Sequence, residues 1–138
     1  MNTHEAHIRI ARPTLDPGSI RRFYVEGLGM SMLYEGSAQI QERRWELVMC
    51  GFENAGWHLE FTRCEPHTIM PSPTVDDLLV FYLGDRTSVQ EAHKTLERLG
   101  GTTVASENPY WDEGGVTLAD PDGYRVVLTG RTWGEVTV

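Results

Sequence analysis

One order of predicted elements occurs twice in this sequence: a strand, a helix and then three strands. The first copy spans about residues 5–63 and the second about residues 76–130, with a proline-rich linker at 64–75 and a tail at 131–138. Each copy offers one helix to cover one face of an amphipathic sheet. The repeat therefore predicts a single α+β domain in which two βαβββ repeats form a curled mixed sheet, with the helices outside and a cup-shaped polar face.

Alternation of apolar and polar residues defines the strands that matter most for function. In the first strand, residues 6–11, His7 and Arg9 lie opposite the isoleucines, and in the fourth strand His58 and Glu60 lie opposite the large apolar residues. These four side chains are therefore predicted to share the polar face.

Both helices carry start signals in the sequence. Asp16 precedes Pro17, an arrangement typical of an N-cap followed by proline in the first turn. Ser88 with Glu91 three residues later matches a capping box and predicts that the second helix opens at Ser88. Both helices end in Leu-Gly, where glycine stops a helix.

Composition excludes several classes of partner. Twelve basic and twenty acidic residues give a net charge of −8, which would repel nucleic acid. The sequence shows no signal peptide and no stretch long and apolar enough to span a membrane, so we expect a cytoplasmic protein. The two cysteines have neither disulfide-framework nor zinc-site spacing.

The polar face can be interpreted in two ways. Arg9 matches a carboxylate geometrically, which favours an Arg9–Glu60 ion pair in the structure. Alternatively, His7, His58 and Glu60 supply two imidazoles and one carboxylate, a set that binds iron in non-haem oxygenases. Glu60 is also the candidate catalytic residue, as a general base.

Four further residues are candidate ligand contacts. Arg125 alternates with the apolar residues of the last strand and could hold an anionic group, or it could be solvent-exposed. Tyr82 shares the parity of the cup-facing residues in its strand. Tyr110 and Trp111 lie in a Pro/Gly loop, where they could wall a pocket, act as a lid or fix the loop to the core.

Four segments in this order resemble the vicinal oxygen chelate superfamily, which includes glyoxalase I, bleomycin-resistance proteins, fosfomycin-resistance enzymes and extradiol dioxygenases. The segments are "RRFYVEGLGM", "WHLEFT", "DLLVFYLG" and "LADPDGYRVVL". The resemblance spans nearly the whole chain and implies a homodimer.

In metal-using members of this superfamily, four positions on the polar face hold the metal. The resemblance places them at His7 or Arg9, at Glu60, at Leu78 and at Val127. The first position is open between two residues, because the first strand–helix loop looks about two residues longer than usual. Counting back from the helix end favours His7, whereas adjacency to "RIARP" favours Arg9. Leucine and valine have no donor atom for a divalent ion.

The resemblance therefore implies a small-molecule-binding protein without a metal or other cofactor. The alternatives are a lyase, isomerase or dioxygenase with one divalent metal ion at His7, His58 and Glu60, and a metal-free catalyst with Glu60 as base. Activity, ligand and the pairing of the repeats within or between chains stay open at this point.

Overall fold

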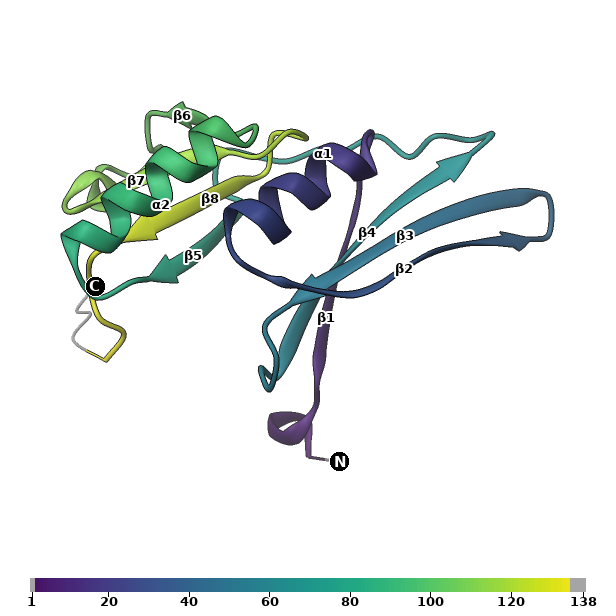
Figure 1. Ribbon diagram of the computed structural model, residues 1–138, viewed down its shortest axis with the longest axis horizontal. Coiled ribbons are helices and arrows are strands. Elements are labelled where there is room, and N and C mark those ends of the chain that lie inside the picture. Colours follow the sequence, from purple (N-terminus) through teal and green to yellow (C-terminus); the bar gives the residue numbers. More distant parts are fainter. Residues whose placement is uncertain (1, 135–138) are drawn as a thin grey trace. The chain divides into compact units, whose positions relative to one another are not determined.

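The computed structural model describes residues 2–134, so residues 135–138 of the predicted tail lie outside the described part (Figure 1). The chain divides into two compact units, Met1–Pro71 and Ser72–Val138, and their boundary falls within the predicted linker. No helix among the described residues is both long and apolar enough to cross a membrane.

The first unit contains one mixed sheet in the order β1-β4-β3-β2, in which β1 and β4 are parallel and the other neighbours antiparallel. Its elements are a short 3-10 helix η1 (Thr3–Glu5), β1 (Ile8–Pro13), α1 (Pro17–Arg21), the π-helical turn η2 (Arg22–Gly27), β2 (Ser31–Ile40), β3 (Arg43–Gly51) and β4 (Trp57–Glu65).

The second unit repeats this topology as β5-β8-β7-β6, again with one parallel pair, β5 and β8. Its elements are β5 (Leu78–Tyr82), α2 (Arg86–Arg98), β6 (Thr102–Val104), a 3-10 helix η3 (Pro109–Asp112), β7 (Gly115–Ala119) and β8 (Arg125–Thr129). The predicted duplication of one strand, one helix and three strands is therefore confirmed.

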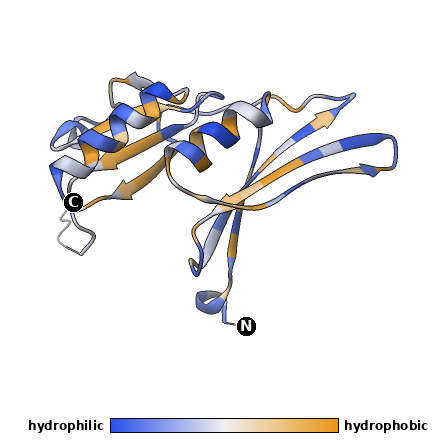
Figure 2. Cartoon of the chain, viewed as in Figure 1, coloured by the Kyte–Doolittle hydropathy of each residue, from blue (hydrophilic) through white to orange (hydrophobic). Residues whose placement is uncertain are grey.

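The helix of each unit packs on one face of its own sheet. In the first unit the side chains of Ile20, Phe23 and Tyr24 are fully buried, and the Tyr24 ring lies 4.9 Å from that of Phe61 on β4. Figure 2 shows the same division in the second unit, where β8 is hydrophobic and α2 has one hydrophilic and one hydrophobic side. Leu96 of α2 is fully buried there.

Both helices begin at an aspartate followed three residues later by serine. Asp16 accepts hydrogen bonds from the backbone and hydroxyl of Ser19, and Asp85 accepts the same two bonds from Ser88. The predicted start at Ser88 is therefore wrong. Asp85 is the N-cap and Ser88 lies inside the first turn, because an aspartate one turn earlier satisfies the free N–H groups.

The sequence analysis also predicted a longer loop before the first helix, and this prediction is wrong. Residues 14–16 and 83–85 are connections of equal length, and the difference lies in the helices. The first helix, residues 17–27, is shorter than α2 and ends in a π-helical turn. A π-helical turn holds more residues than a turn of α-helix.

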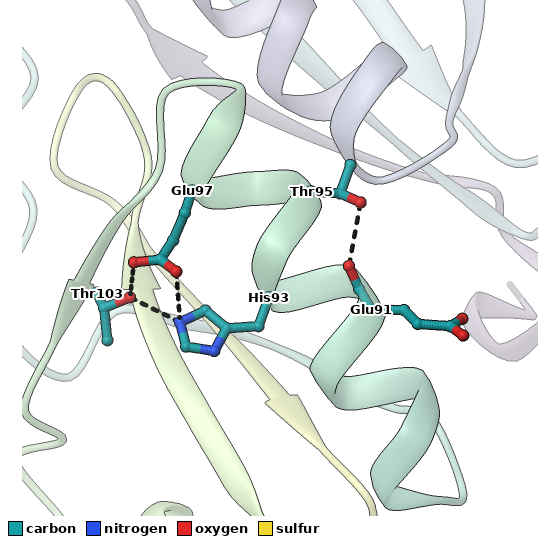
Figure 3. Close-up of polar contacts among 5 residues, drawn as sticks. All are labelled: Glu91, His93, Thr95, Glu97 and Thr103. Atoms are coloured by element: carbon teal, nitrogen blue, oxygen red, sulfur yellow. Dashed lines mark hydrogen bonds and ion pairs between the residues drawn. The ribbon is translucent and has the colours of Figure 1, made fainter.

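A cluster of polar side chains ties α2 to the edge strand β6 (Figure 3). Nε2 of His93 lies 2.8 Å from Oγ1 of Thr103 and 3.4 Å from Oε1 of Glu97, and Thr103 donates to Oε2 of Glu97 at 3.0 Å. All three polar groups satisfy one another at the surface, which gives the cluster a structural role in holding a strand of only three residues.

Candidate functional site

The face of the first sheet that lies opposite its helix carries the polar residues picked out in the sequence. We call this surface the open face. Residues paired directly across neighbouring strands point to the same side of a sheet. Glu60 pairs with Met49 of β3 and with Ala11 of β1, and Met49 pairs with Tyr34 of β2. Arg9, two residues before Ala11, shares this face.

Arg9 on the edge strand β1 and Glu60 on the neighbouring strand β4 form an ion pair on the open face. Nη1 of Arg9 lies 3.1 Å from Oε2 of Glu60, with 53% of the arginine side chain and 12% of the glutamate side chain exposed. The predicted ion pair is confirmed. Because the carboxylate is mostly withdrawn from water, it depends on the guanidinium more than a surface carboxylate would.

Two histidines extend this pair into a continuous chain of hydrogen bonds. Nε of Arg9 lies 3.2 Å from Nε2 of His58, and Nδ1 of His58 lies 2.6 Å from Nε2 of His7. An arginine N–H only donates, so Nε2 of His58 is the acceptor and its Nδ1 carries the hydrogen. That hydrogen is donated to Nε2 of His7. The tautomers of both rings are assigned by the arginine donor.

His58 is held neutral by its surroundings. Burial lowers its pKa below the ordinary value of 6.5, the neighbouring His7 and Arg9 lower it further, and Glu60 acts in the opposite direction. Protonation of Nε2 would set an N–H against the N–H of Arg9, so the geometry and the pKa agree.

Gly51 makes room for this arrangement. A Cβ built on Gly51, the cross-strand partner of His58, would lie 3.0 Å from Cβ of His58 and 3.3 Å from its Cα. Any larger residue would push His58 away from Arg9 or separate the strands. Sequence reasoning missed Gly51, although a glycine within a strand often marks such close packing.

The strand pairing within each repeat shows which residue of the first strand corresponds to Leu78. Val80 pairs with Val127 as Ala11 pairs with Glu60, and Leu78 stands two residues before Val80. The matching residue of the first unit is Arg9, whereas His7 precedes the strand.

A glyoxalase-type metal centre does not fit the residues present. Arginine, leucine and valine occupy three of the four positions and cannot ligate a divalent ion. In the alternative set, both nitrogens of His58 and Nε2 of His7 are engaged in hydrogen bonds. Within residues 2–134, the structure brings together no group of three or more histidine, cysteine, aspartate or glutamate side chains that could hold a metal ion.

The corresponding face of the second sheet is covered by its own loop, residues 105–112. Ser106 lies 2.7 Å from the hydroxyl of Thr117, and Nη1 of Arg125 donates to the carbonyl of Ala105 at 3.2 Å. Loop residues and Leu78 line the same narrow recess, and Thr117 and Val127 are buried. Arg125 therefore fastens the loop.

The aromatic candidates of the second unit are packed against neighbouring side chains. Tyr110 makes an edge contact with Trp111, with ring centroids 4.9 Å apart, and the guanidinium of Arg131 lies 4.3 Å from the Tyr110 ring. Tyr82 packs against Trp133 at 5.4 Å. The structure thus brings together His7, Arg9, His58 and Glu60, and places Tyr82, Tyr110, Trp111 and Arg125 in the second unit.

The open face is less polar than the sequence alternation suggested. Besides the ion pair it carries Tyr34 and Met49, neither of which the sequence reasoning singled out. A recess of about 550 Å³ lies elsewhere, at the β2–β3 turn between Gln41, Glu42, Arg43, Pro66 and His67. It contains none of the residues of the hydrogen-bonded chain.

Sequence models of two YycE-like domains match this chain, the N-terminal domain at residues 8–62 and the C-terminal domain at residues 76–130. The uncharacterized protein YycE of Bacillus subtilis strain 168 is 45% identical over 123 residues, which cover 89% of this chain and 86% of YycE. A crystal structure of a Bacillus subtilis YycE protein of unknown function has a TM-score of 0.84 at 41% identity and covers 96% of this chain and 95% of that one.

Two structures of lower identity share the fold. Trypanothione-dependent glyoxalase I of Leishmania major has a TM-score of 0.67 at 20% identity, covering 89% of this chain and 84% of its own. TnmS3, an antibiotic binding protein from Streptomyces sp. CB03234, has a TM-score of 0.62 at 19% identity, covering 96% and 99%. These similarities, together with two four-stranded mixed sheets, confirm the predicted glyoxalase-type α+β fold.

Proposed function

This chain belongs to the YycE-like family within the vicinal oxygen chelate superfamily, and we propose that it binds a small organic molecule on the open face of its first sheet without a metal ion. The Arg9–Glu60 ion pair carries this proposal, because it occupies two of the four positions to which the resemblance to metal-using members assigns the metal ligands. A structure that is similar at the level of the fold belongs to an antibiotic binding protein, which supports the same class of function.

The ion pair presents a fixed and partly exposed polar group. His58 holds Nε of Arg9 and Glu60 holds Nη1, so the guanidinium is oriented before any ligand arrives. Preorganised polar groups on an otherwise apolar surface favour binding, because little conformational entropy is lost when the ligand docks.

Catalysis through a metal is the less supported alternative. The donor atoms of His58 are engaged by Arg9 and His7, and a metal ion would have to displace an arginine donor. Catalysis by Glu60 as a general base also meets an obstacle, since the carboxylate oxygen is committed to the guanidinium.

Thermal-shift screening of a library of neutral and basic organic molecules tests the proposal. We expect a binder to raise the unfolding temperature of the wild-type protein and to lose most of this effect in Arg9→Met. Arg63→Met is the matched control, because Arg63 pairs with Glu65 at the same 3.1 Å but at the surface. A shift that survives in Arg9→Met would place the ligand elsewhere.

Elemental analysis separates the alternatives. We expect no stoichiometric iron, nickel, manganese or zinc in protein purified without chelator. One equivalent of any of these metals that is lost in Glu60→Gln would instead support the metalloenzyme. Turnover that resists chelator but is lost in Glu60→Gln would support the metal-free catalyst. The homodimer stays a prediction, which sedimentation equilibrium would test.

A further inference from the structure

The recess at the turn between β2 and β3 takes no part in the proposed function. Its volume of about 550 Å³ is in the range of sites that hold small molecules. The turn with the start of β3 forms one wall, and the first residues after β4 form the other. The lining residues are Gln41, Glu42, Arg43, Pro66 and His67, all within the first compact unit.

Arg43 is held in one position in this recess by three neighbouring groups. Its Nε donates to Sγ of Cys64 at 3.0 Å, and its Nη2 donates to the carbonyl oxygen of His67 at 3.3 Å. Its guanidinium carbon also lies 4.9 Å from the centroid of the Trp45 ring, which is a cation–π contact. An arginine that is already oriented loses little conformational entropy when a ligand binds to it.

No carboxylate of the first unit neutralises Arg43. In the part of the chain that the structure describes, its guanidinium forms no ion pair, and Nη1 makes no hydrogen bond to the protein. This differs from Arg9, whose charge is paired with Glu60. A partly buried guanidinium without a carboxylate is stabilised when an anionic group binds to it. Nη1 is therefore available to a negatively charged group of a ligand.

Glu42 supplies the opposite charge in the same recess. Its side chain is exposed, and among residues 2–134 it forms no ion pair either. A ligand with a single charge would be attracted by one of the two residues and repelled by the other, whereas a zwitterion is attracted by both. A zwitterion also adds no net charge to a chain that carries −8. Two opposite charges that line one recess without pairing therefore favour a zwitterionic ligand.

We propose that this recess is a second binding site and that it takes an α-amino acid, with the carboxylate at Arg43 and the ammonium group at Glu42. The two charged groups of an α-amino acid are joined through one carbon atom, so a single small recess can hold both. The ring of Pro66 offers an apolar surface to the side chain of the amino acid. This inference goes beyond the proposed function, because it uses none of the residues of the open-face ion pair.

Three forms of one amino acid test the requirement for both charges. L-Phenylalanine carries both, N-acetyl-L-phenylalanine keeps only the carboxylate, and L-phenylalaninamide keeps only the ammonium group. We expect titrations of the wild-type protein, followed by NMR, to show that L-phenylalanine binds roughly tenfold more tightly than either blocked form. Each blocked form loses one hydrogen bond between charged groups, and this accounts for the difference.

Single variants assign each charge of the amino acid to its partner. In Arg43→Gln the advantage of L-phenylalanine over the amide should disappear, while its advantage over the N-acetyl form remains. In Glu42→Gln the reverse should hold, and this exposed turn residue can be changed without loss of the fold, as circular dichroism would show. Arg44→Gln and Glu46→Gln remove the same charges outside the recess, so both advantages should stay as in the wild-type protein.

The outcomes separate this site from the proposed function. No binding of L-phenylalanine, or equal affinities of the wild-type protein for the three forms, would overturn the inference. Advantages that survive in both Arg43→Gln and Glu42→Gln would place the amino acid elsewhere and overturn it as well. Arg9→Met should leave all three affinities unchanged, and a loss of binding in that variant would contradict a separate site.

Discussion

Removing Arg9 or Glu60 should destabilise the first unit in a coupled way. Arg9→Met keeps most of the apolar stem but leaves the Glu60 carboxylate, with 12% of its side chain exposed, without a cation, and His58 without its donor. Exposed pairs contribute about 0.2–1 kcal/mol, and breaking a fully buried pair costs about 3–5 kcal/mol. Since the arginine is half exposed, we expect Arg9→Met to cost about 1–3 kcal/mol.

Glu60→Gln should cost less, because the amide oxygen still accepts from Arg9. The double variant should be less destabilised than the sum of the two, with a coupling energy of about 1 kcal/mol. Urea unfolding followed by tryptophan fluorescence measures all four proteins, and equal denaturant slopes would show that the changes are in stability.

The pair Arg63–Glu65 is a matched control on the same strand. Its atoms are also 3.1 Å apart, but 40% and 50% of the two side chains are exposed. We expect a coupling energy below about 0.5 kcal/mol that 1 M salt removes, whereas the Arg9–Glu60 coupling should persist in salt. Equal couplings in the two pairs would refute the argument that withdrawal of the Glu60 carboxylate from water makes its ion pair important.

Three further predictions follow from single residues. Because the pKa of His58 is lowered on folding, the unfolded chain takes up the proton at a higher pH than the folded protein does. The free energy of unfolding should therefore be full above pH 6.5 and fall below it. His58→Asn should flatten this pH dependence, and an unchanged profile would contradict the prediction. Asp85→Ala should lower the thermal unfolding midpoint by removing the cap of α2, whereas Glu91→Ala should not, and the reverse result would restore the capping box. Burial raises the pKa of Cys50 to about 12, so a thiol reagent at pH 8 should modify Cys50 only after denaturation, as peptide mapping by mass spectrometry would show.

The fold could be predicted largely because its signals are periodic and occur twice. Alternation located the strands, and the proline-rich linker located the boundary between the two compact units. One error arose where two neighbouring segments both matched the start of a helix. Ser88 with Glu91 matched a capping box, but Asp85 with Ser88 repeats the spacing of Asp16 with Ser19, and the internal repeat would have distinguished them.

The alternation of side chains along the strands, or parity, predicted part of the site. Parity placed Arg9 and Glu60 on one face, and the chemistry of arginine then favoured the ion pair that the structure shows. The histidine tautomers depend on distances of a few tenths of an ångström, which parity does not contain. Nor does the alternation show that the tip of the Tyr34 ring lies over Gly36, because that contact depends on the rotamer of the tyrosine.

The two repeats differ in what covers equivalent faces of the same scaffold. In the second unit, apolar residues take the positions of Arg9 and Glu60, and the loop 105–112 covers Leu78 and Thr117. The polar groups of this face, the hydroxyl of Thr117 and the guanidinium of Arg125, are bonded to the loop, so the covered face needs no further partner. In the first unit the ion pair keeps the face polar. The connection that corresponds to the loop 105–112 is the turn between β2 and β3, which has only two residues, 41–42. The open face thus carries a neutral ion pair and, two strands away, a half-exposed tyrosine, and an organic molecule that displaces water from its apolar part gains free energy. We therefore expect a ligand on the first unit to be bound by that unit's residues, and substitutions in the loop 105–112 to change stability rather than affinity.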